Sequence, residues 1–498
     1  MSTTLVPLPV VLPLLAAAVS VIANRHPRFQ RALGTVVLMG VLAVSVGLLV
    51  GVQDGTVLVA HIGGWESDVG IVLAVDTLSA LMLVVSALML LVVFVYAVGS
   101  PATEDDAPFF HPLYLVLMAG VSASFVTADL FNLFVAFEVM LVASYVLITL
   151  GGSRAQVRHG MTYVVVSLLA STLFVTAIGL VYAVTGTVNL GRLAVVMQDV
   201  DPALRSALGL LLLVVFGVKA AIFPLFSWLP DSYPTAPAPV TAVFAGLLTK
   251  VGVYAIIRTQ TLLFNDGVGS TLLLVIAGLT MTVGVLGAIA QDDVKRILSF
   301  HIVSQIGYMI FGLGLFTLAG IAGAVLYMLH HIVVKTTLFL VAGLLEQTAG
   351  TAQLRRLGGL LHLTPVVAVL FLLPALSLAG LPPFSGFVAK LSLVQAGFAS
   401  GAWVIVGVSL GVSLLTLFSM TKIWNGVFWG QPDENPPAGD LAEAAARGLP
   451  RLMVGSTGVL VVVSLAFSVA AAPIHDLSQQ AARELLDRTA YVQAVTGR

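Results

Sequence analysis

The segment GVKAAIFPLFSWLPDSYPTAP, from Gly217 to Pro237, sets one lysine in a long apolar stretch and follows it with four prolines. A lysine in the middle of a membrane-spanning helix costs about 2.5–3.5 kcal/mol on insertion scales, so Lys219 needs a reason to be there. Prolines remove backbone donors and interrupt helices, which is tolerated at membrane depth where the freed carbonyls meet protein or water. We therefore predict a broken helix through which water reaches Lys219; a kink used only for packing is the alternative.

The composition indicates a membrane protein. Of 498 residues, 59% are hydrophobic and 9% are charged, whereas a soluble domain has about 25% charged residues. Apolar segments of about 20 residues recur along the chain, and each is long enough to cross a hydrocarbon core of about 30 Å as a helix. The alternation typical of membrane β-barrels is absent. We predict an all-α polytopic membrane protein with about 14 transmembrane helices.

Several classes of chemistry are excluded by residues that the sequence lacks. It contains no cysteine, which excludes disulfides, thiolate catalysis and cysteine-bound iron–sulfur or zinc sites. No GxGxxG, Walker A, HExxH or GxSxG motif lies where it could bind a nucleotide or a metal or act as a nucleophile. The net charge of −1 does not suggest nucleic-acid binding. We expect no catalytic residues, no metal site and no cofactor, and hence neither a hydrolase nor a nucleotide-driven pump.

The basic residues predict an orientation. Arginines follow the first apolar stretch, whereas a signal peptide has its basic residues before it. Counting spans forward places most other basic loops on that same side, which is the cytoplasmic side by the positive-inside rule. We expect a bacterial cell (inner) membrane protein with its N-terminus outside. The residues counted on the cytoplasmic side are Arg25, Arg28, Arg31, Arg154, Arg158, Lys295, Arg296, Arg355, Arg356, Arg447 and Arg451.

Two segments of the chain are similar to each other in sequence. TLFVTAIGLVYAVTGTVNLGRL from Thr172 is similar to TLFLVAGLLEQTAGTAQLRRL from Thr337, at an initial offset of 165 residues. By our span count this offset covers five helices, and an odd number turns the second copy upside down, as in transporters built from inverted repeats. Chance similarity between two apolar helices is the alternative.

The repeat predicts two inverted five-helix halves, each with one broken helix. The breaks are expected at Pro224 and Pro230 in the first half and at Pro382 and Pro383, in LAGLPPFSGFVAK, in the second. The expected parts are an N-terminal three-helix segment (1–108), a first half-channel (109–262), a second, inverted half-channel (263–430), and a polar linker, last transmembrane helix and polar tail (431–498).

Charged and titratable residues inside the predicted spans are the candidates for function. His331 and Lys335 are four residues apart and so share a helix face. Glu138 and Lys219 would neutralise each other in adjacent spans, and a static buried salt bridge is the alternative there. The lysines outnumber their potential acidic partners, which favours groups that exchange protons. The candidates are Glu138, Lys219, Lys250, His330, His331, Lys335 and Lys390.

Several titratable residues keep two interpretations each. His330 and His331 either relay protons, because imidazole titrates near pH 6.5, or hydrogen-bond between helices. His301, near the cytoplasmic end of its span, is either structural or a proton entry. Asp129, near a span end, either helps a proton or cation leave or caps a helix.

These motifs resemble a known family. The chain from Phe109 to Trp429 is similar to the antiporter-like subunits shared by respiratory complex I, membrane-bound hydrogenases and Mrp-type Na⁺/H⁺ antiporters, and is most similar to the Mrp branch. The motifs that carry the resemblance are FPLFSWLPDSYPTAPAPVTA (223–242), GLLTKVGVYAIIR (246–258), DDVKRILSFHIVSQIGYM (292–309), LHHIVVKTTLFLVAG (329–343) and GLPPFSGFVAK (380–390).

The resemblance implies roles for the candidate residues. Glu138 and Lys219 match the paired acid and lysine of the first half-channel, and Lys250 matches the lysine that joins the halves. His331 and Lys335 match the central relay of the second half, and Lys390 matches its terminal lysine. Relatives from complex I often have a histidine where VSQIGYM has Gln305, with His301 four residues earlier, so the entry histidine does not transfer directly.

We therefore expect a proton-translocating subunit of a multi-subunit Mrp-type Na⁺/H⁺ antiporter. Its partners would be other subunits of the complex and the lipid bilayer, and the transported ions would be protons and Na⁺. One alternative is a proton-pumping subunit of an NADH-quinone oxidoreductase or a membrane-bound hydrogenase. Another is a scaffold whose buried charges only hold helices together.

Overall fold

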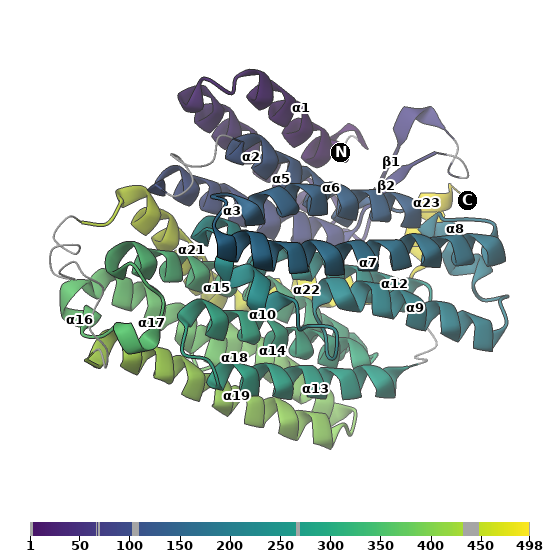
Figure 1. The fold of residues 1–498 in the computed structure, drawn as a ribbon. Coiled ribbons are helices and arrows are strands. Elements are labelled where there is room, and N and C mark those ends of the chain that lie inside the picture. Colours follow the sequence, from purple (N-terminus) through teal and green to yellow (C-terminus); the bar gives the residue numbers. More distant parts are fainter. Residues whose placement is uncertain are drawn as a thin grey trace.

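A computed structural model describes residues 3–65, 67, 70–101, 109–264, 269–431 and 448–497. Most of its helices run side by side along one common direction (Figure 1). Within the described residues, twelve helices are long and apolar enough to cross a membrane. This confirms the polytopic helical class. Two further expected spans fall on shorter apolar helices, Phe110–Val126 and Pro365–Ala379, so the count of about 14 stays a prediction.

The elements of the first part of the chain follow one another with short connections. In order they are η1 (Thr3–Leu5), α1 (Leu8–Ile22), α2 (Pro27–Gly51), β1 (Leu58–His61), η2 (Ile62–Gly64), β2 (Val72–Val75), α3 (Thr77–Val98), α5 (Phe110–Val126), α6 (Leu130–Thr149), α7 (Arg154–Thr185), α8 (Leu190–Val196), α9 (Pro202–Ala220), α10 (Leu229–Ser232), η3 (Tyr233–Thr235), α11 (Ala238–Val243), η4 (Phe244–Leu248) and α12 (Thr249–Leu262).

The second part begins after α12. Its elements are α13 (Ser270–Ile289), α14 (Val294–Gly314), α15 (Leu318–Ala349), η5 (Leu354–Arg356), α16 (Leu360–Leu363), α17 (Pro365–Ala379), α18 (Ser385–Ala399), α19 (Trp403–Trp424), η6 (Asn425–Trp429), α21 (Arg451–Val469), α22 (Ala471–Leu486) and α23 (Thr489–Thr496). Most of the predicted linker, with Arg447, falls in 432–447, outside the described residues, as does the predicted boundary at 108.

A two-stranded antiparallel sheet accompanies the helices. β1 pairs with β2 in the register Leu58 opposite Val75, and these strands lie beside α8 and α23 at one end of the bundle (Figure 1). We call this the hairpin end. The opposite end holds the start of α14 and the end of α19, where Lys422 and Asp292 form an ion pair. We call it the linker end.

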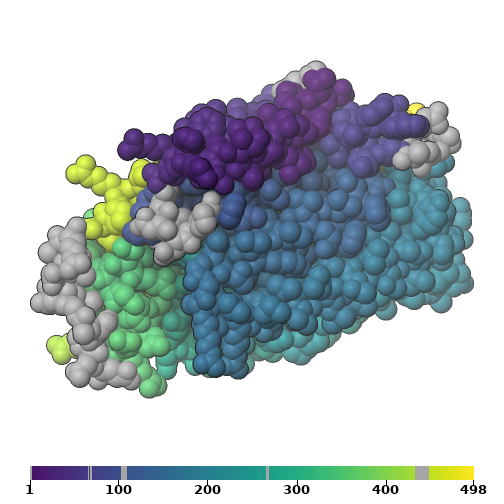
Figure 2. Space-filling view, turned by 45° about the horizontal axis from the view of Figure 1, so that its top comes forward, coloured from purple at the N-terminus to yellow at the C-terminus, as the bar shows by residue number. Residues whose placement is uncertain are grey.

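The first two helices form an outer layer. Figure 2 shows α1 and α2 on the surface of the remaining helices. Large apolar side chains on both helices are exposed, among them Leu15, Ile22 and Val36. α3, the next helix, is by contrast mostly buried. An apolar surface of this kind suits contact with lipid or with other membrane helices.

Two helices stop inside the bundle, as predicted. α9 ends where Ala221 adopts a left-handed conformation (φ 57°), and Pro224 follows in the connection to α10. α17 ends at Gly380 (φ 88°), and Pro382 and Pro383 lie in the connection to α18. Pro230 differs from the expectation, because it lies in the first turn of α10, where a missing N–H costs little.

α7 and α15 have the features that an inverted repeat requires. Both contain 32 residues, and each ends at a glycine with positive φ, Gly186 (69°) and Gly350 (67°). α7 ends before α8, which lies at the hairpin end (Figure 1). α15 runs the opposite way, because it ends before η5, which contacts η6 at the linker end. Their matching ends put equivalent positions 164 residues apart, one fewer than the predicted initial offset. The repeat itself stays a prediction.

The C-terminal tail packs against its own chain. Ser478, Ala481 and Leu485 are buried where α22 packs beside α15 and α3. The Glu484 carboxylate accepts hydrogen bonds from the backbone N–H and the hydroxyl of Thr77, at 3.0 and 2.7 Å, and so caps the start of α3. The tail is therefore part of the bundle.

Candidate functional site

The predicted site residues lie in the interior of the bundle. Glu138 on α6 is half-buried. The exposed fractions of the other side chains are 7% for Lys219 and Lys390, 1% for His330, and 0% for Lys250, His301, His331 and Lys335. Burial of this many titratable groups is costly in a membrane protein, so their partners decide what they do.

Close approaches at glycines bring together the helices that bear these residues. A Cβ added at Gly252 would lie 2.7 Å from the backbone nitrogen of Ala220, so α12 touches α9 beside Lys219. A Cβ at Gly246 would collide with the Thr336 hydroxyl, where η4 meets α15. The elements therefore contact one another in the order α9, α12, η4, α15, where η4 and α12 form one continuous span.

The same contact order continues into the second half. A Cβ at Gly386, near the start of α18, would lie 3.0 Å from Cε1 of His330 on α15. His330 Nδ1 and the Ser385 hydroxyl are also 2.9 Å apart. The lysines of α9, α12, α15 and α18 thus belong to one chain of packed helices, which we call the lysine row: Lys219, Lys250, Lys335 and Lys390.

Glu138 and Lys219 are joined through a third residue. The Ser171 hydroxyl on α7 donates a hydrogen bond to the Glu138 carboxylate. Lys219 Nζ donates to the same hydroxyl at 3.1 Å and to the backbone carbonyl of Ser167 at 3.1 Å. Glu138 and Lys219 therefore contact each other through Ser171, which lies between the two side chains, and do not form the direct salt bridge that was the alternative.

A small cavity lies beside Lys219. It has a volume of about 10 Å³ and is lined by Tyr163, Trp228 and Tyr233 together with apolar side chains of α6 and α9. That is about the room that one water molecule needs. The break after α9 thus leaves space next to the lysine.

Lys250 lies directly after a π-helical turn. Its ammonium donates to the carbonyl of Ala245, in η4, and to the Thr249 hydroxyl at 3.2 Å. Single π-helical turns often occur at functional sites, because they leave a carbonyl that the regular α-helical ladder would not expose. Apolar periodicity does not distinguish such a turn from an ordinary helix.

The middle of α15 carries three titratable groups. Lys335 Nζ donates to the Leu298 carbonyl on α14 at 3.0 Å. His331, four residues earlier, shares its helix face as predicted, and neither of its ring nitrogens has a hydrogen-bond partner among the described residues. The Tyr327 ring lies 6.3 Å from the His331 ring and 5.7 Å from that of His330. A fully buried imidazole in this state is unusual and suits a group that exchanges protons.

Lys390 lies over the second helix break. Its Nζ donates to the carbonyl of Ala379, the last residue of α17, at 3.1 Å. The same ammonium lies 4.9 Å from the centre of the Tyr308 ring, a cation–π distance. A carbonyl freed at the end of a broken helix thus holds a lysine in the second half.

His301 and Asp129 are held by structural contacts. His301 Nε2 lies 2.9 Å from the Ser419 hydroxyl, and its Nδ1 has no partner in the part of the chain that the structure describes. Asp129 caps α6 by accepting from the Asn132 N–H at 2.7 Å. Gln305 contacts Tyr327. Asp129 thus caps α6, and its role in the exit of a proton or cation stays a prediction.

An ion pair at the hairpin end was missed from the sequence. Arg258 on α12 donates to both carboxylate oxygens of Asp76, at 2.6 and 2.8 Å, and both residues are buried. The Ser79 hydroxyl and the Tyr254 hydroxyl also accept from Arg258, at 3.2 and 3.1 Å. Asp76 lies at a span boundary, where its charge resembled that of an ordinary loop residue.

The charges at the linker end are paired as well. Lys295 contacts Glu346 at 3.0 Å, and Arg296 contacts Asp231 at 2.9 Å. Hydrogen bonding from Lys422, at 3.0 Å, holds the pKa of the Asp292 carboxyl below its usual value. These residues anchor the connections of α14 and α19.

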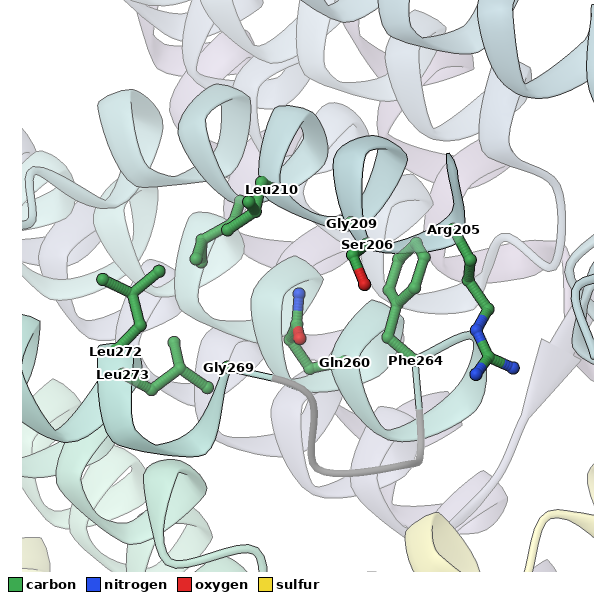
Figure 3. Close-up of a pocket in the computed structure, with 10 residues that line it drawn as sticks. Arg205, Ser206, Gly209, Leu210, Gln260, Phe264, Gly269, Leu272 and Leu273 are labelled. Carbon is green, nitrogen blue, oxygen red and sulfur yellow. The ribbon is translucent and has the colours of Figure 1, made fainter. Parts of the chain in front are cut away.

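A larger apolar pocket is separate from the lysine row. Figure 3 shows it between the starts of α9 and α13 and the end of α12, with Leu210, Leu272 and Leu273 on one side and Arg205 on the other. Its volume is about 170 Å³, and none of the row residues lines it.

Comparison with known proteins shows the family to which the chain belongs. The family model described as NADH:quinone oxidoreductase/Mrp antiporter, TM, matches residues 127–416, which include α6 to α18. The chain belongs to this antiporter-like family.

Full-length relatives place it near one branch of the antiporter-like family. A protein of Alkalihalophilus pseudofirmus, named as a subunit of an Na(+)/H(+) antiporter, is 42% identical, with 99% of each chain covered. A Bacillus subtilis protein of the same name is 38% identical, with 98% of each covered. A chain in the structure of the Mrp complex from Dietzia sp. is 37% identical, with a TM-score of 0.93 over 100% of both chains. The resemblance to the Mrp branch is thereby confirmed.

Proposed function

We propose that this chain carries protons within a multi-subunit Na⁺/H⁺ antiporter. One observation supports this most strongly: the four ammonium groups of the lysine row donate to carbonyls and hydroxyls, and none of them donates to a carboxylate among the described residues. An ammonium group held by carbonyls and hydroxyls can pass on its proton without breaking a direct ion pair.

The first half would begin with Glu138 and Lys219. While Ser171 joins them, the carboxylate stabilises the charged lysine; when the contact opens, Lys219 releases its proton towards Lys250. A membrane potential supplies about 2.3 kcal/mol per charge per 100 mV. This energy is of the same order as a 10- to 100-fold change in proton affinity, since each factor of ten corresponds to about 1.4 kcal/mol.

The second half would continue along α15 and α18. Lys250 lies on α12, which follows η4, and η4 touches α15 beside Thr336, the neighbour of Lys335. The ring nitrogens of His331, unpartnered among the described residues, would accept and donate a proton between lysines. His330 contacts Ser385 at the start of α18, the helix that bears Lys390. His301 remains a candidate for proton entry.

The remaining predictions complete the proposal. The chain would work as a secondary-transporter subunit, with two half-channels at 109–262 and 263–430, in the bacterial cell membrane with its N-terminus outside. The names of the full-length relatives support antiport as the activity.

The test compares Na⁺-driven proton movement in everted vesicles that contain the whole complex. Lys219→Ala should reduce it at least tenfold while native gels show an assembled complex. Lys422→Ala, which removes a lysine of the linker end, should retain it. Full antiport by assembled Lys219→Ala would contradict the proposal, and no antiport by the assembled wild type would favour a redox-driven pump.

A further inference from the structure

Ser171 contacts both members of the acid–lysine pair. Its side chain is buried on α7, its hydroxyl donates to Glu138, and its oxygen accepts from Lys219 at 3.1 Å. A hydroxyl has one donor and two acceptor sites, so this arrangement satisfies a charged lysine and a charged carboxylate at once. We propose that Ser171 is a positioning residue that couples Glu138 to Lys219, an inference that rests on the proposed function.

The coupling depends on a rotatable proton. With Lys219 charged, the ammonium donates and the hydroxyl must donate elsewhere, which it does to Glu138. With Lys219 neutral, its nitrogen gains a lone pair and accepts, so the hydroxyl turns towards Lys219 and its hydrogen bond to Glu138 is lost. The protonation of Lys219 thus decides whether Glu138 is held.

The backbone of α7 fixes the geometry of this bridge. Ser167, one turn before Ser171, presents its carbonyl to Lys219 at 3.1 Å, so α7 holds the ammonium at two points. α7 itself is fixed by a capping box at Ser153 and Gln156 and by Gly186 at its end. α7 also packs against both α6 and α9, so a side chain on it can bridge the two helices.

Three variants of the whole complex test this role by antiport in everted vesicles. Ser171→Ala removes only the hydroxyl and should lower the antiport rate at least fivefold in an assembled complex. Ser171→Thr restores a hydroxyl and should recover at least half of the wild-type rate. Thr172→Val, which removes the exposed neighbouring hydroxyl, should have no effect. A wild-type rate for Ser171→Ala would overturn the inference.

Infrared difference spectra of the purified complex provide a second measurement, which a change in assembly alone would not alter. The carboxylate band of Glu138 is identified by its loss in Glu138→Gln. We expect it to shift in Ser171→Ala and to return in Ser171→Thr; an unshifted band in Ser171→Ala would also overturn the inference. An active Lys219→Ala complex refutes the proposed function, whereas inactive Lys219→Ala with fully active Ser171→Ala refutes only the role of Ser171.

Discussion

The basic side chains in the middle of the bundle and those at its two ends have different partners. In the middle, Lys250 and Lys335 donate to carbonyls and a hydroxyl. At the hairpin end Arg258 pairs with Asp76, and at the linker end Lys295 pairs with Glu346. Within the described residues, these basic groups at the ends are neutralised by acids, and the two lysines in the middle are not.

Under the proposed function, this difference separates charges that hold the fold from charges that exchange protons. Removing one partner of a buried ion pair leaves the other uncompensated and costs about 3–5 kcal/mol. Removing a buried lysine that contacts only carbonyls leaves no charge behind, so stability should be unchanged or rise. Variants at the ends should therefore affect stability, and variants in the middle should affect transport.

The largest stability effect is expected at the hairpin end. Asp76→Asn leaves Arg258 charged and buried, and should destabilise the chain by about 3–5 kcal/mol. The measurement is thermal unfolding of the purified complex. Removing both charges, in Asp76→Asn with Arg258→Gln, should recover part of the loss. If Asp76→Asn had normal stability but lost antiport, the proposed difference between charges at the ends of the bundle and charges in its middle would be wrong.

The smallest effect is expected at the linker end. Asp292 is about half exposed and pairs with Lys422 and Arg355, so Asp292→Asn should cost no more than about 0.5 kcal/mol at pH 7. Because its pKa is lowered in the folded state, this contribution is present above the unfolded value of about 3.9 and is lost as the pH falls through the folded value. The difference between wild type and Asp292→Asn in unfolding midpoint should therefore shrink below about pH 4 and disappear at lower pH.

A difference that persists at full strength in strong acid would show that Asp292 acts by packing. The linker end would then not be an example of stabilisation by ion pairs, whereas the hairpin end would remain one.

The sequence predicts those features whose energetic cost depends on a residue and its neighbours along the chain. A lysine in an apolar segment is conspicuous because burial of a charge is expensive, and all four lysines of the row are buried as expected. The two helix breaks were equally visible, since proline removes a donor wherever it occurs. Membership of the family followed from the same residues.

Features that depend on pairing across the fold were not visible. Ser171 is one of many serines in the spans, and nothing in its neighbourhood along the chain separates it from the others. Asp76 and Arg258 are 182 residues apart and lie at span boundaries, where charges are ordinary. The strands β1 and β2 are four residues each, too short to show alternation against a helical background.

Lys250 gives the most direct test of the central claim, because it lies between the two halves and its ammonium donates to a carbonyl and a hydroxyl. The measurement is Na⁺-driven proton movement in everted vesicles that contain the complex with Lys250→Met, with assembly and unfolding temperature measured on the same preparation. We predict a loss of at least tenfold in antiport with unchanged or higher stability. Antiport at the wild-type rate in the assembled Lys250→Met complex would contradict a proton route along the lysine row.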